Sequence, residues 1–255
     1  MGEGSGNAAA VRITMLAKRY GALVALSEVS LEVRAGEAFG LDGANGAGKT
    51  TLIKCMLELS SGDSGSVEIF GVPARLPHAR RRLSYVPERF MPPHYLRGGE
   101  FLAVLAQLAG VRFDAARARA LLAELQLDAS VLERPVRELS KGMTQKLGLA
   151  AAFLLERELY VLDEPMSGLD PAARVAVKSV LRRLAAEGRT LFFTSHVLAD
   201  VEELCSSIAV LEKGSVRFRG TPAELCERYG EALLEQAFMR CPCLSLRCSW
   251  STMIR

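Results

Sequence analysis

The chain has 255 residues, of which 49% are hydrophobic and 24% charged, with a net charge of +3. This composition is that of an ordinary globular protein and excludes wholesale disorder. The nearly balanced charge gives no reason to expect a nucleic-acid partner. The longest uncharged stretch, residues 101–111, is shorter than the roughly 18 apolar residues of a membrane helix. Residues 1–7 lack the basic start and apolar run of a secretory signal, so we expect a cytoplasmic protein.

The cysteines divide into two groups. Cys55, Cys205 and Cys226 stand in apolar contexts, which is typical of reduced thiols in a core. Cys241, Cys243 and Cys248 cluster near the end of the chain, but no fourth ligand or nearby histidine completes a metal site. This spacing therefore argues against a structural metal.

The first part of the chain predicts strands that lead into one helix. Residues 1–10 are rich in glycine and predict a flexible tail. Residues 29–33 alternate as a half-exposed strand does, and residues 38–41 form a short buried strand. A helix over residues 50–59 follows, with an apolar face.

The middle of the chain predicts helices and then strands. Residues 101–108, 115–127 and 141–155 are helical in pattern, so residues 87–156 read as a helical insertion between two halves of a sheet domain, 11–86 and 157–240. The fully apolar runs 159–162 and 190–193 suit parallel strands covered on both faces. Residues 208–211 and 215–218 resemble a hairpin. The composition changes abruptly in residues 241–255, which look foreign to the domain.

A phosphate-binding loop follows the second strand. The stretch matches G-x-x-x-x-G-K-[ST] between a strand and a helix, and consists of Gly43, Ala44, Asn45, Gly46, Ala47, Gly48, Lys49 and Thr50, with Thr51 next. Glycines let backbone N–H groups converge on phosphate oxygens, and the helix N-terminus adds a positive dipole end. Lys49 would contact the β- and γ-phosphates, and the Thr50 hydroxyl would bind Mg²⁺. A chance glycine-rich turn is the alternative, and the strand–loop–helix order argues against it.

Two adjacent carboxylates follow the apolar strand at 159–162. Asp163 would belong to the Mg²⁺ shell, and Glu164 would orient or deprotonate the attacking water. Pro165 predicts an extended backbone at Glu164. Without the phosphate loop, an exposed acidic pair making salt bridges would explain these residues equally well.

The stretch Leu139, Ser140, Lys141, Gly142 and Met143 resembles the signature loop of ATP-binding cassette (ABC) ATPases. The resemblance implies an α/β P-loop NTPase: a mostly parallel sheet core, an antiparallel β subdomain and an inserted helical subdomain. It also implies a head-to-tail dimer, either a homodimer or a pair with a paralogous ATPase subunit. ATP would then lie between Lys49 of one subunit and Ser140 of the other.

Four further residues occupy family positions in the same order. Tyr20 matches the aromatic residue that stacks on adenine, Glu88 the switch-loop position and a metal ligand, Asp170 the loop between dimer partners, and His196 the histidine at the γ-phosphate. Each has a plainer alternative. Tyr20 alone reads as a core or surface aromatic and His196 as a hydrogen-bonded histidine. Asp170 could cap a helix that begins at Pro171, with or without its dimer role.

Two departures from the family pattern stand out. Glu88 replaces the usual Gln, and together with the Leu-Ser-Lys-Gly-Met form this resembles cassettes of the bacterial ABC-2 export type. Asp42 stands where the family has an apolar residue, and its carboxylate should weaken the anion-binding field unless it is paired or turned away. We expect nucleotide binding to survive.

The resemblance implies an ATP-hydrolysing, Mg²⁺-dependent subunit that drives separate membrane permease subunits, most similar to exporters, from the inner face of the cell membrane. The catalytic residues would be Lys49, Glu164 and His196. The alternative is a soluble cassette ATPase of a non-transport machine such as iron–sulfur cluster assembly. A small-molecule kinase would not explain the stretch 139–142. The basic run 80–82 is read as a solvated face, with lipid headgroup contact as the lesser reading.

Overall fold

The computed structural model describes residues 8–241. The first strand, β1 (Ala9–Tyr20), begins inside the expected tail, because Ala9 pairs with Arg34 of β2 and Ala10 is fully buried. The predicted boundary after residue 10 is therefore wrong by two residues; residues 1–7 lie outside the described part of the chain.

The C-terminal boundary also needs a correction. Cys241 is completely buried, and its backbone N–H donates to the carbonyl oxygen of Ala237 at 3.0 Å. The last described residue thus belongs to the domain rather than to the tail predicted from residue 241. The rest of that tail, with Cys243 and Cys248, lies outside the described residues.

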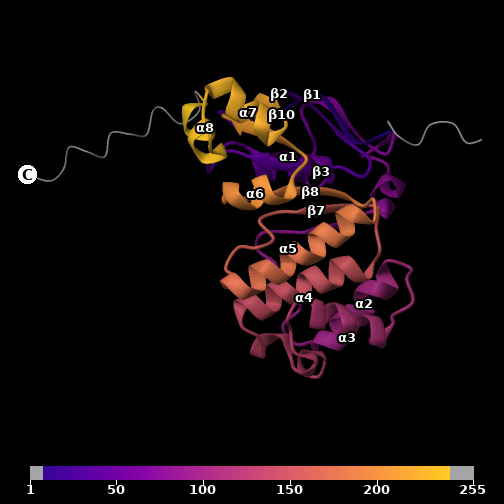
Figure 1. Ribbon diagram of the computed structural model, residues 1–255. Coiled ribbons are helices and arrows are strands. Elements are labelled where there is room, and N and C mark those ends of the chain that lie inside the picture. Colours follow the sequence, from indigo (N-terminus) through magenta and orange to yellow (C-terminus); the bar gives the residue numbers. More distant parts are fainter. Residues whose placement is uncertain (1–7, 242–255) are drawn as a thin grey trace, which may run out of the picture.

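Two sheets make up the upper part of the molecule (Figure 1). One is antiparallel, in the order β2 (Leu23–Arg34), β1, β4 (Ser64–Ile69) and β5 (Val72–Pro73). The other has the order β10 (Ser215–Gly220), β9 (Ser207–Glu212), β3 (Ala38–Asp42), β8 (Thr190–Thr194), β7 (Leu159–Leu162) and β6 (Leu83–Val86). Its neighbouring strands are parallel except β9 and β10, which form the predicted hairpin.

The central parallel strands are predominantly apolar because both faces of the sheet are covered. Phe192 of β8 packs in a cluster with Leu52 and Ile53 of α1 (Lys49–Met56) and with the antiparallel sheet. Phe193, the next residue, points to the opposite face, where it packs with the helices. Successive side chains of a strand alternate between faces, so a continuous apolar run is what a doubly covered strand requires.

The predicted helical insertion forms the lower part of the molecule in Figure 1. It consists of α2 (Gly98–Leu108), α3 (Ala115–Glu124), α4 (Lys141–Leu154) and the 3₁₀ turns Ala129–Leu132 and Val136–Glu138. The other elements are the 3₁₀ turn Pro77–Arg82, α5 (Pro171–Ala186), α6 (Leu198–Leu204), α7 (Pro222–Tyr229) and α8 (Leu234–Arg240).

The parallel register brings four strand ends to one edge of the larger sheet. Strands β3, β6, β7 and β8 run in the same direction, so the residues after them meet at their carboxyl ends. These residues include Gly43, Glu88, Asp163 and His196. Within residues 8–241, no helix has the length and apolar character needed to cross a membrane.

Candidate functional site

The loop after β3 is shaped by glycines that no other residue could replace. Gly43 has a φ of 152°, and a Cβ there would lie 2.3 Å from the carbonyl oxygen of Leu211. Gly48 has a φ of 112°, and a Cβ there would lie 2.6 Å from the carbonyl oxygen of Ala25. Both positions combine a backbone conformation that favours glycine with a close approach of another chain segment. The loop therefore packs tightly against the backbone of β2 and β9.

The start of α1 is built to receive an anion. Gly48 occupies the N-cap and provides no side chain to cap the helix, and the first turn carries no acidic residue. The first N–H groups of the helix thus remain available, with the positive end of the helix dipole behind them. Lys49 lies beside them and donates from Nζ to the carbonyl oxygen of Gly43 at 2.5 Å and of Ala44 at 3.5 Å.

Asp42, the unusual residue before the loop, uses one of its two carboxylate oxygens in a hydrogen bond. Its side chain is buried, with 3% of the residue exposed, and its Oδ1 accepts a hydrogen bond from the N–H of Gly43 at 2.5 Å. Its Oδ2 has no hydrogen-bond partner among residues 8–241. Burial raises the pKa of this carboxyl to about 6, against the opposing effects of the Gly43 N–H and the Lys49 ammonium. The carboxylate is therefore held away from solvent but is not neutralised by an ion pair.

Asp163 is held by two hydroxyl groups at the end of β7. Oδ1 accepts a hydrogen bond from Oγ1 of Thr194 at 2.7 Å, and Oδ2 accepts one from Oγ1 of Thr50 at 3.3 Å. Burial raises the pKa of Asp163, and the two threonine hydrogen bonds oppose that rise. The carboxylate and the Thr50 hydroxyl are thus brought side by side, as the sequence predicted.

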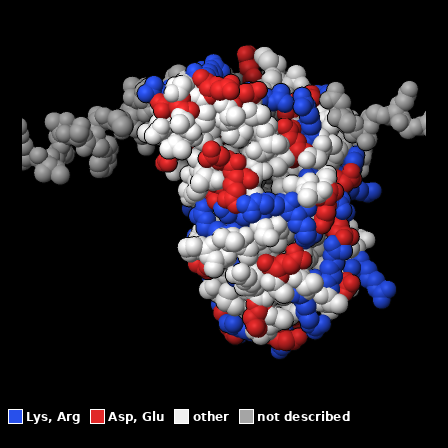
Figure 2. All heavy atoms as spheres, in the orientation of Figure 1, with Lys and Arg blue, Asp and Glu red and all other residues white. Residues whose placement is uncertain are grey.

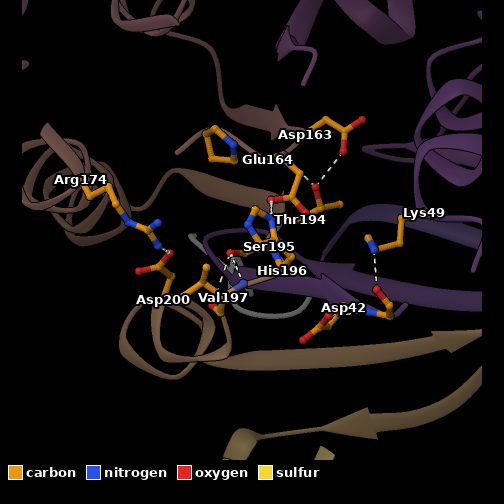
Figure 3. Close-up of polar contacts among 12 residues, drawn as sticks. Asp42, Lys49, Asp163, Glu164, Arg174, Thr194, Ser195, His196, Val197 and Asp200 are labelled. Atoms are coloured by element: carbon orange, nitrogen blue, oxygen red, sulfur yellow. Dashed lines mark hydrogen bonds and ion pairs between the residues drawn. The ribbon is translucent and has the colours of Figure 1, made fainter. Parts of the chain in front are cut away.

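Glu164 and His196 form the central contact of the site (Figure 3). Oε2 of Glu164 lies 2.6 Å from Nδ1 of His196, and the backbone N–H of His196 donates to the same oxygen at 3.3 Å. The backbone N–H of Glu164 in turn donates to Oγ1 of Thr194 at 2.9 Å. The ends of β7 and β8 are therefore joined through these side chains.

The extended backbone predicted for Glu164 is wrong. Its φ is 50°, in the left-handed region, which costs on the order of 1–3 kcal/mol for a residue with a side chain. Its carbonyl oxygen accepts a turn hydrogen bond from the N–H of Ser167 at 3.0 Å. The contacts with Thr194 and His196 outweigh the local preference set by Pro165, and they fix where the carboxylate points.

A cavity of about 590 Å³ connects these groups. Its lining includes most of the predicted site residues, namely Tyr20, Ala44, Asn45, Gly46, Ala47, Gly48, Lys49, Thr50, Thr51, Glu88, Asp163, Glu164 and His196. Leu23, Val24 and Ala25 of β2 and Ser167 complete it. Tyr20 stands at the rim with 47% of its surface exposed, and its hydroxyl lies 3.2 Å from Oγ of Ser60. The volume is in the range of small-molecule sites.

The signature stretch does not line this cavity. Ser140 is the N-cap of α4, and its Oγ accepts a hydrogen bond from the N–H of Met143 at 3.3 Å. Lys141 lies over Gly168, where a Cβ would be 3.2 Å from the lysine Cε. Within the described chain, residues 139–143 form a second helix start that is separate from Lys49 and its loop.

Asp170 caps a helix, as one of its two interpretations predicted. Its side chain accepts a hydrogen bond from the N–H of Ala173 at 2.9 Å, and Pro171 is the first residue of α5. The same hydrogen bond lowers the pKa of Asp170. Its role toward a second subunit stays a prediction.

Two residues near the site were not predicted to matter. Gln145 of α4 is buried, and its Nε2 donates to the carbonyl oxygen of Pro165, next to Glu164, at 3.2 Å. Phe90, two residues after Glu88, packs against Gly148 of α4 and edge-on against Phe101. No local sequence pattern marks either contact, because both depend on packing between segments that are distant in the chain.

The donor atoms at the strand ends suit a hard cation. Thr50 and Asp163 place a hydroxyl and a carboxylate oxygen side by side, and Glu88 lines the same cavity. Oxygen ligands of this kind are those that Mg²⁺ prefers, usually together with substrate phosphates. The residues present therefore fit the predicted metal.

Comparison with known proteins agrees with this arrangement. The family model described as ABC transporter matches residues 26–167. The Nod factor export ATP-binding protein I of Burkholderia orbicola is 40% identical over 215 residues, which are 82% of this chain and 70% of that protein. An uncharacterized ABC transporter ATP-binding protein of Synechocystis is 38% identical over 204 residues, 78% of this chain. The chain spans only 57% of the length of the Synechocystis protein, and 62% of the length of a similar protein from Nostoc.

Solved structures show the same fold. The structure of an ATP-binding subunit of an ABC transporter superposes with a TM-score of 0.82 at 33% identity, covering 91% of this chain and 99% of that one. A dimeric ATP-binding cassette bound to ADP and phosphate gives a TM-score of 0.76 at 21% identity, covering 83% and 98%. The chain therefore belongs to the ABC transporter family and has the P-loop cassette fold that the sequence predicted.

Proposed function

We propose that this chain binds and hydrolyses MgATP as the nucleotide-binding subunit of an ABC exporter. The observation that carries the proposal is the convergence, in one cavity, of an uncapped helix start with Lys49, the Asp163–Thr50 pair and the Glu164–His196 contact. These groups supply an anion site, a cation site and a general base, which are the parts that phosphoryl transfer requires.

Binding would begin at the phosphate loop. The free N–H groups of α1 would hold the phosphate oxygens, and the Lys49 ammonium would turn from the carbonyl of Gly43 toward the β- and γ-phosphates. Tyr20 would stack on the base at the exposed rim. Thr50, Asp163 and Glu88 would hold Mg²⁺, which neutralises phosphate charge when bound.

Hydrolysis would depend on Glu164. Its carboxylate lies in the cavity beside the phosphate loop, where it can orient a water molecule and accept its proton. His196 holds that carboxylate at 2.6 Å and would contact the γ-phosphate from the other side. The backbone strain at Glu164 supports this role, because strained residues persist where surrounding contacts over-determine them.

A second subunit would complete the site. Ser140 and the start of α4 form a further anion-binding helix end that lies outside the cavity of its own chain. A head-to-tail pairing, with itself or with a paralogous subunit, would place this helix end on the triphosphate held by Lys49 of the partner. Hydrolysis would then reopen the pair and drive a conformational cycle.

Membrane permease subunits would dock on the helical insertion, which would locate the chain at the inner face of the membrane. Met91, Tyr95 and Leu108 are large apolar residues with 85%, 70% and 79% of their surface exposed. Met91 and Tyr95 lie in the loop segment that follows Glu88, so part of the exposed surface adjoins the proposed switch loop. The export relatives support this assignment. Isolation of the chain with an integral membrane protein would support it, whereas isolation with soluble scaffold proteins only would contradict it.

An ATPase assay tests the chemistry. The purified chain with Mg²⁺ should release phosphate from ATP, and chelation of the metal should abolish the release. Phosphate release that is unchanged in Lys49→Ala would refute the assignment of the cavity as the site.

A further inference from the structure

The segments that contain Asp170 and His196 lead into helices α5 and α6, and ion pairs join these two helices. Asp170 caps α5, and His196 stands two residues before the start of α6. Figure 2 shows a band of basic side chains at the level of α5 with acidic side chains beside it at the level of α6. The ion pairs between the two helices join Arg174, Lys178 and Arg182 of α5 to Asp200 and Glu203 of α6.

Asp200 is the buried carboxylate of this set. NH2 of Arg174 donates to Oδ2 of Asp200 at 2.5 Å, and the side chain of Asp200 is only 4% exposed. Nζ of Lys178 lies 3.5 Å from the other carboxylate oxygen. A buried carboxylate is tolerated only when it is paired and hydrogen-bonded, so these two cations fix where Asp200 lies. Glu203, at 33% side-chain exposure, is far less constrained by burial.

Core packing of Leu198 and Val201 and the polar contacts of its first turn hold helix α6 in place. It is seven residues long, and Val197 at its N-cap offers no side-chain cap. The backbone N–H of Asp200 donates to the carbonyl oxygen of Val197 at 3.0 Å, which ties the anchored carboxylate to the first turn. Oγ of Ser195 accepts a hydrogen bond from the Val197 N–H at 3.1 Å. The position of His196, between Ser195 and Val197, therefore follows the position of Asp200.

We propose that Arg174 is a positioning residue: through Asp200 it holds the start of α6 so that His196 lies against Glu164. This inference rests on the proposed ATP hydrolysis. Figure 3 shows the Arg174–Asp200 pair on the far side of Ser195 and Val197 from Glu164. Neither residue of the pair lines the nucleotide cavity, whereas His196 and Glu164 do. The pair should therefore govern the rate of hydrolysis and leave nucleotide binding unaffected.

The test uses the full chain with Arg174→Gln, Asp200→Asn and the double variant, each measured for kcat, for KM with MgATP and for the Kd of MgADP. We expect each single variant to lower kcat about tenfold, a typical effect of removing the partner that orients a functional side chain. KM and the MgADP Kd should change less than about twofold. The double variant should be no slower than the slower single variant, because both changes remove the same interaction.

Two further variants separate positioning from general stability. Arg174→Lys keeps the charge and should recover most of the lost kcat. Arg182→Gln is the matched control, since Arg182 lies on the same helix with its side chain 53% exposed and pairs with Glu203, and it should leave kcat within about twofold. If Asp200→Asn is insoluble, the proposal is tested with Arg174→Gln and Arg174→Lys alone. These two variants should fold, because Lys178 still compensates the charge of Asp200 in each of them.

The outcomes are distinguishable. A wild-type chain without ATP turnover would overturn the proposed function and this inference with it. An active wild type whose Arg174→Gln variant keeps its kcat would overturn this inference alone. A loss of kcat matched by an equal loss of MgADP affinity, or not recovered by Arg174→Lys, would also overturn it, because it would reflect general damage.

Discussion

Oε2 of Glu164 lies 2.6 Å from Nδ1 of His196, although the two residues are 32 positions apart in the chain. The contact joins the ends of two neighbouring parallel strands, and it holds a carboxylate at the wall of the cavity that contains the phosphate loop. Glu164 adopts a left-handed backbone to make it. This relationship is the basis of the first prediction.

The Glu164→Gln variant should bind MgATP but hydrolyse it at least about 100-fold more slowly, since a general base typically contributes that much or more. Glutamine keeps the size of the side chain and can still hydrogen-bond His196, so the fold should be retained. Phosphate release and nucleotide affinity would be measured together. Glu187→Gln, a change in an exposed residue paired with Arg183, is the control. Unchanged turnover would remove Glu164 from the chemistry.

The Lys49→Ala variant should lose MgATP affinity by more than about tenfold, because the phosphates lose a charge-assisted contact. Within the described part of the chain, the Lys49 ammonium bonds only to backbone carbonyls of its own loop, at Gly43 and Ala44. The free energy of unfolding should therefore change little. Calorimetric titration with MgADP and a urea melt measure the two quantities. A large loss of stability at normal affinity would contradict the role assigned to Lys49.

The Asp42→Asn variant should be more stable than the wild type, and increasingly so as the pH rises. Burial raises the pKa of Asp42 to about 6 from an ordinary value of 3.8, so the folded state resists ionisation. Ionisation of the buried carboxylate therefore lowers the free energy of unfolding. This loss develops between those two pH values and is complete above the higher one, where it reaches on the order of 3 kcal/mol. Asparagine would avoid it, because it is never charged.

Urea unfolding of the wild type and Asp42→Asn near pH 4.5 and pH 8 measures this effect. The difference in the free energy of unfolding should be about a third as large at the lower pH as at the higher one. A difference that does not vary with pH would show that Asp42 is compensated in a way that the unpartnered Oδ2 does not indicate. The wild type should still bind MgATP at pH 8, because Gly43 N–H and Lys49 partly offset the buried charge.

The Gly148→Ala variant should be destabilised by about 1–3 kcal/mol, the usual cost of overpacking. Alanine normally stabilises a helix relative to glycine, but a Cβ at Gly148 would lie 2.7 Å from the ring of Phe90. The ring is itself held against Phe101. Thermal melting checks the sign, and Phe90→Leu in the same chain should recover part of the loss. A more stable Gly148→Ala variant would show that the loop after Glu88 is free to move away.

The parts of the fold that follow from local pattern were predictable. The apolar runs at 159–162 and 190–193 became parallel strands because their composition already required cover on both faces. The phosphate loop was predictable because its glycines and Lys49 stand at fixed spacing between a strand and a helix. The carboxylates at Asp163 and Glu164 were placed correctly because strand ends gather at one edge of such a sheet.

The contacts that depend on tertiary packing were not predictable. Pro165 favours an extended Glu164, but hydrogen bonds to Thr194 and His196 from another strand decide its backbone. Gln145 gave no sign that it would reach the carbonyl of Pro165. Arg174 and Asp200 are 26 positions apart and lie on different helices. A run of charged residues on one helix does not reveal which residue of another helix will pair with it. The strand at Ala9 was missed because glycine-rich sequence precedes it.

In the proposed dimer, two subunits enclose the nucleotide between Lys49 of one and Ser140 of the other. Sedimentation velocity of the Glu164→Gln variant, with and without MgATP, tests this most directly, because slow hydrolysis would preserve the closed state. We predict a monomer without nucleotide and a dimer with MgATP. A chain that remains monomeric at every concentration while MgATP is bound would contradict the account.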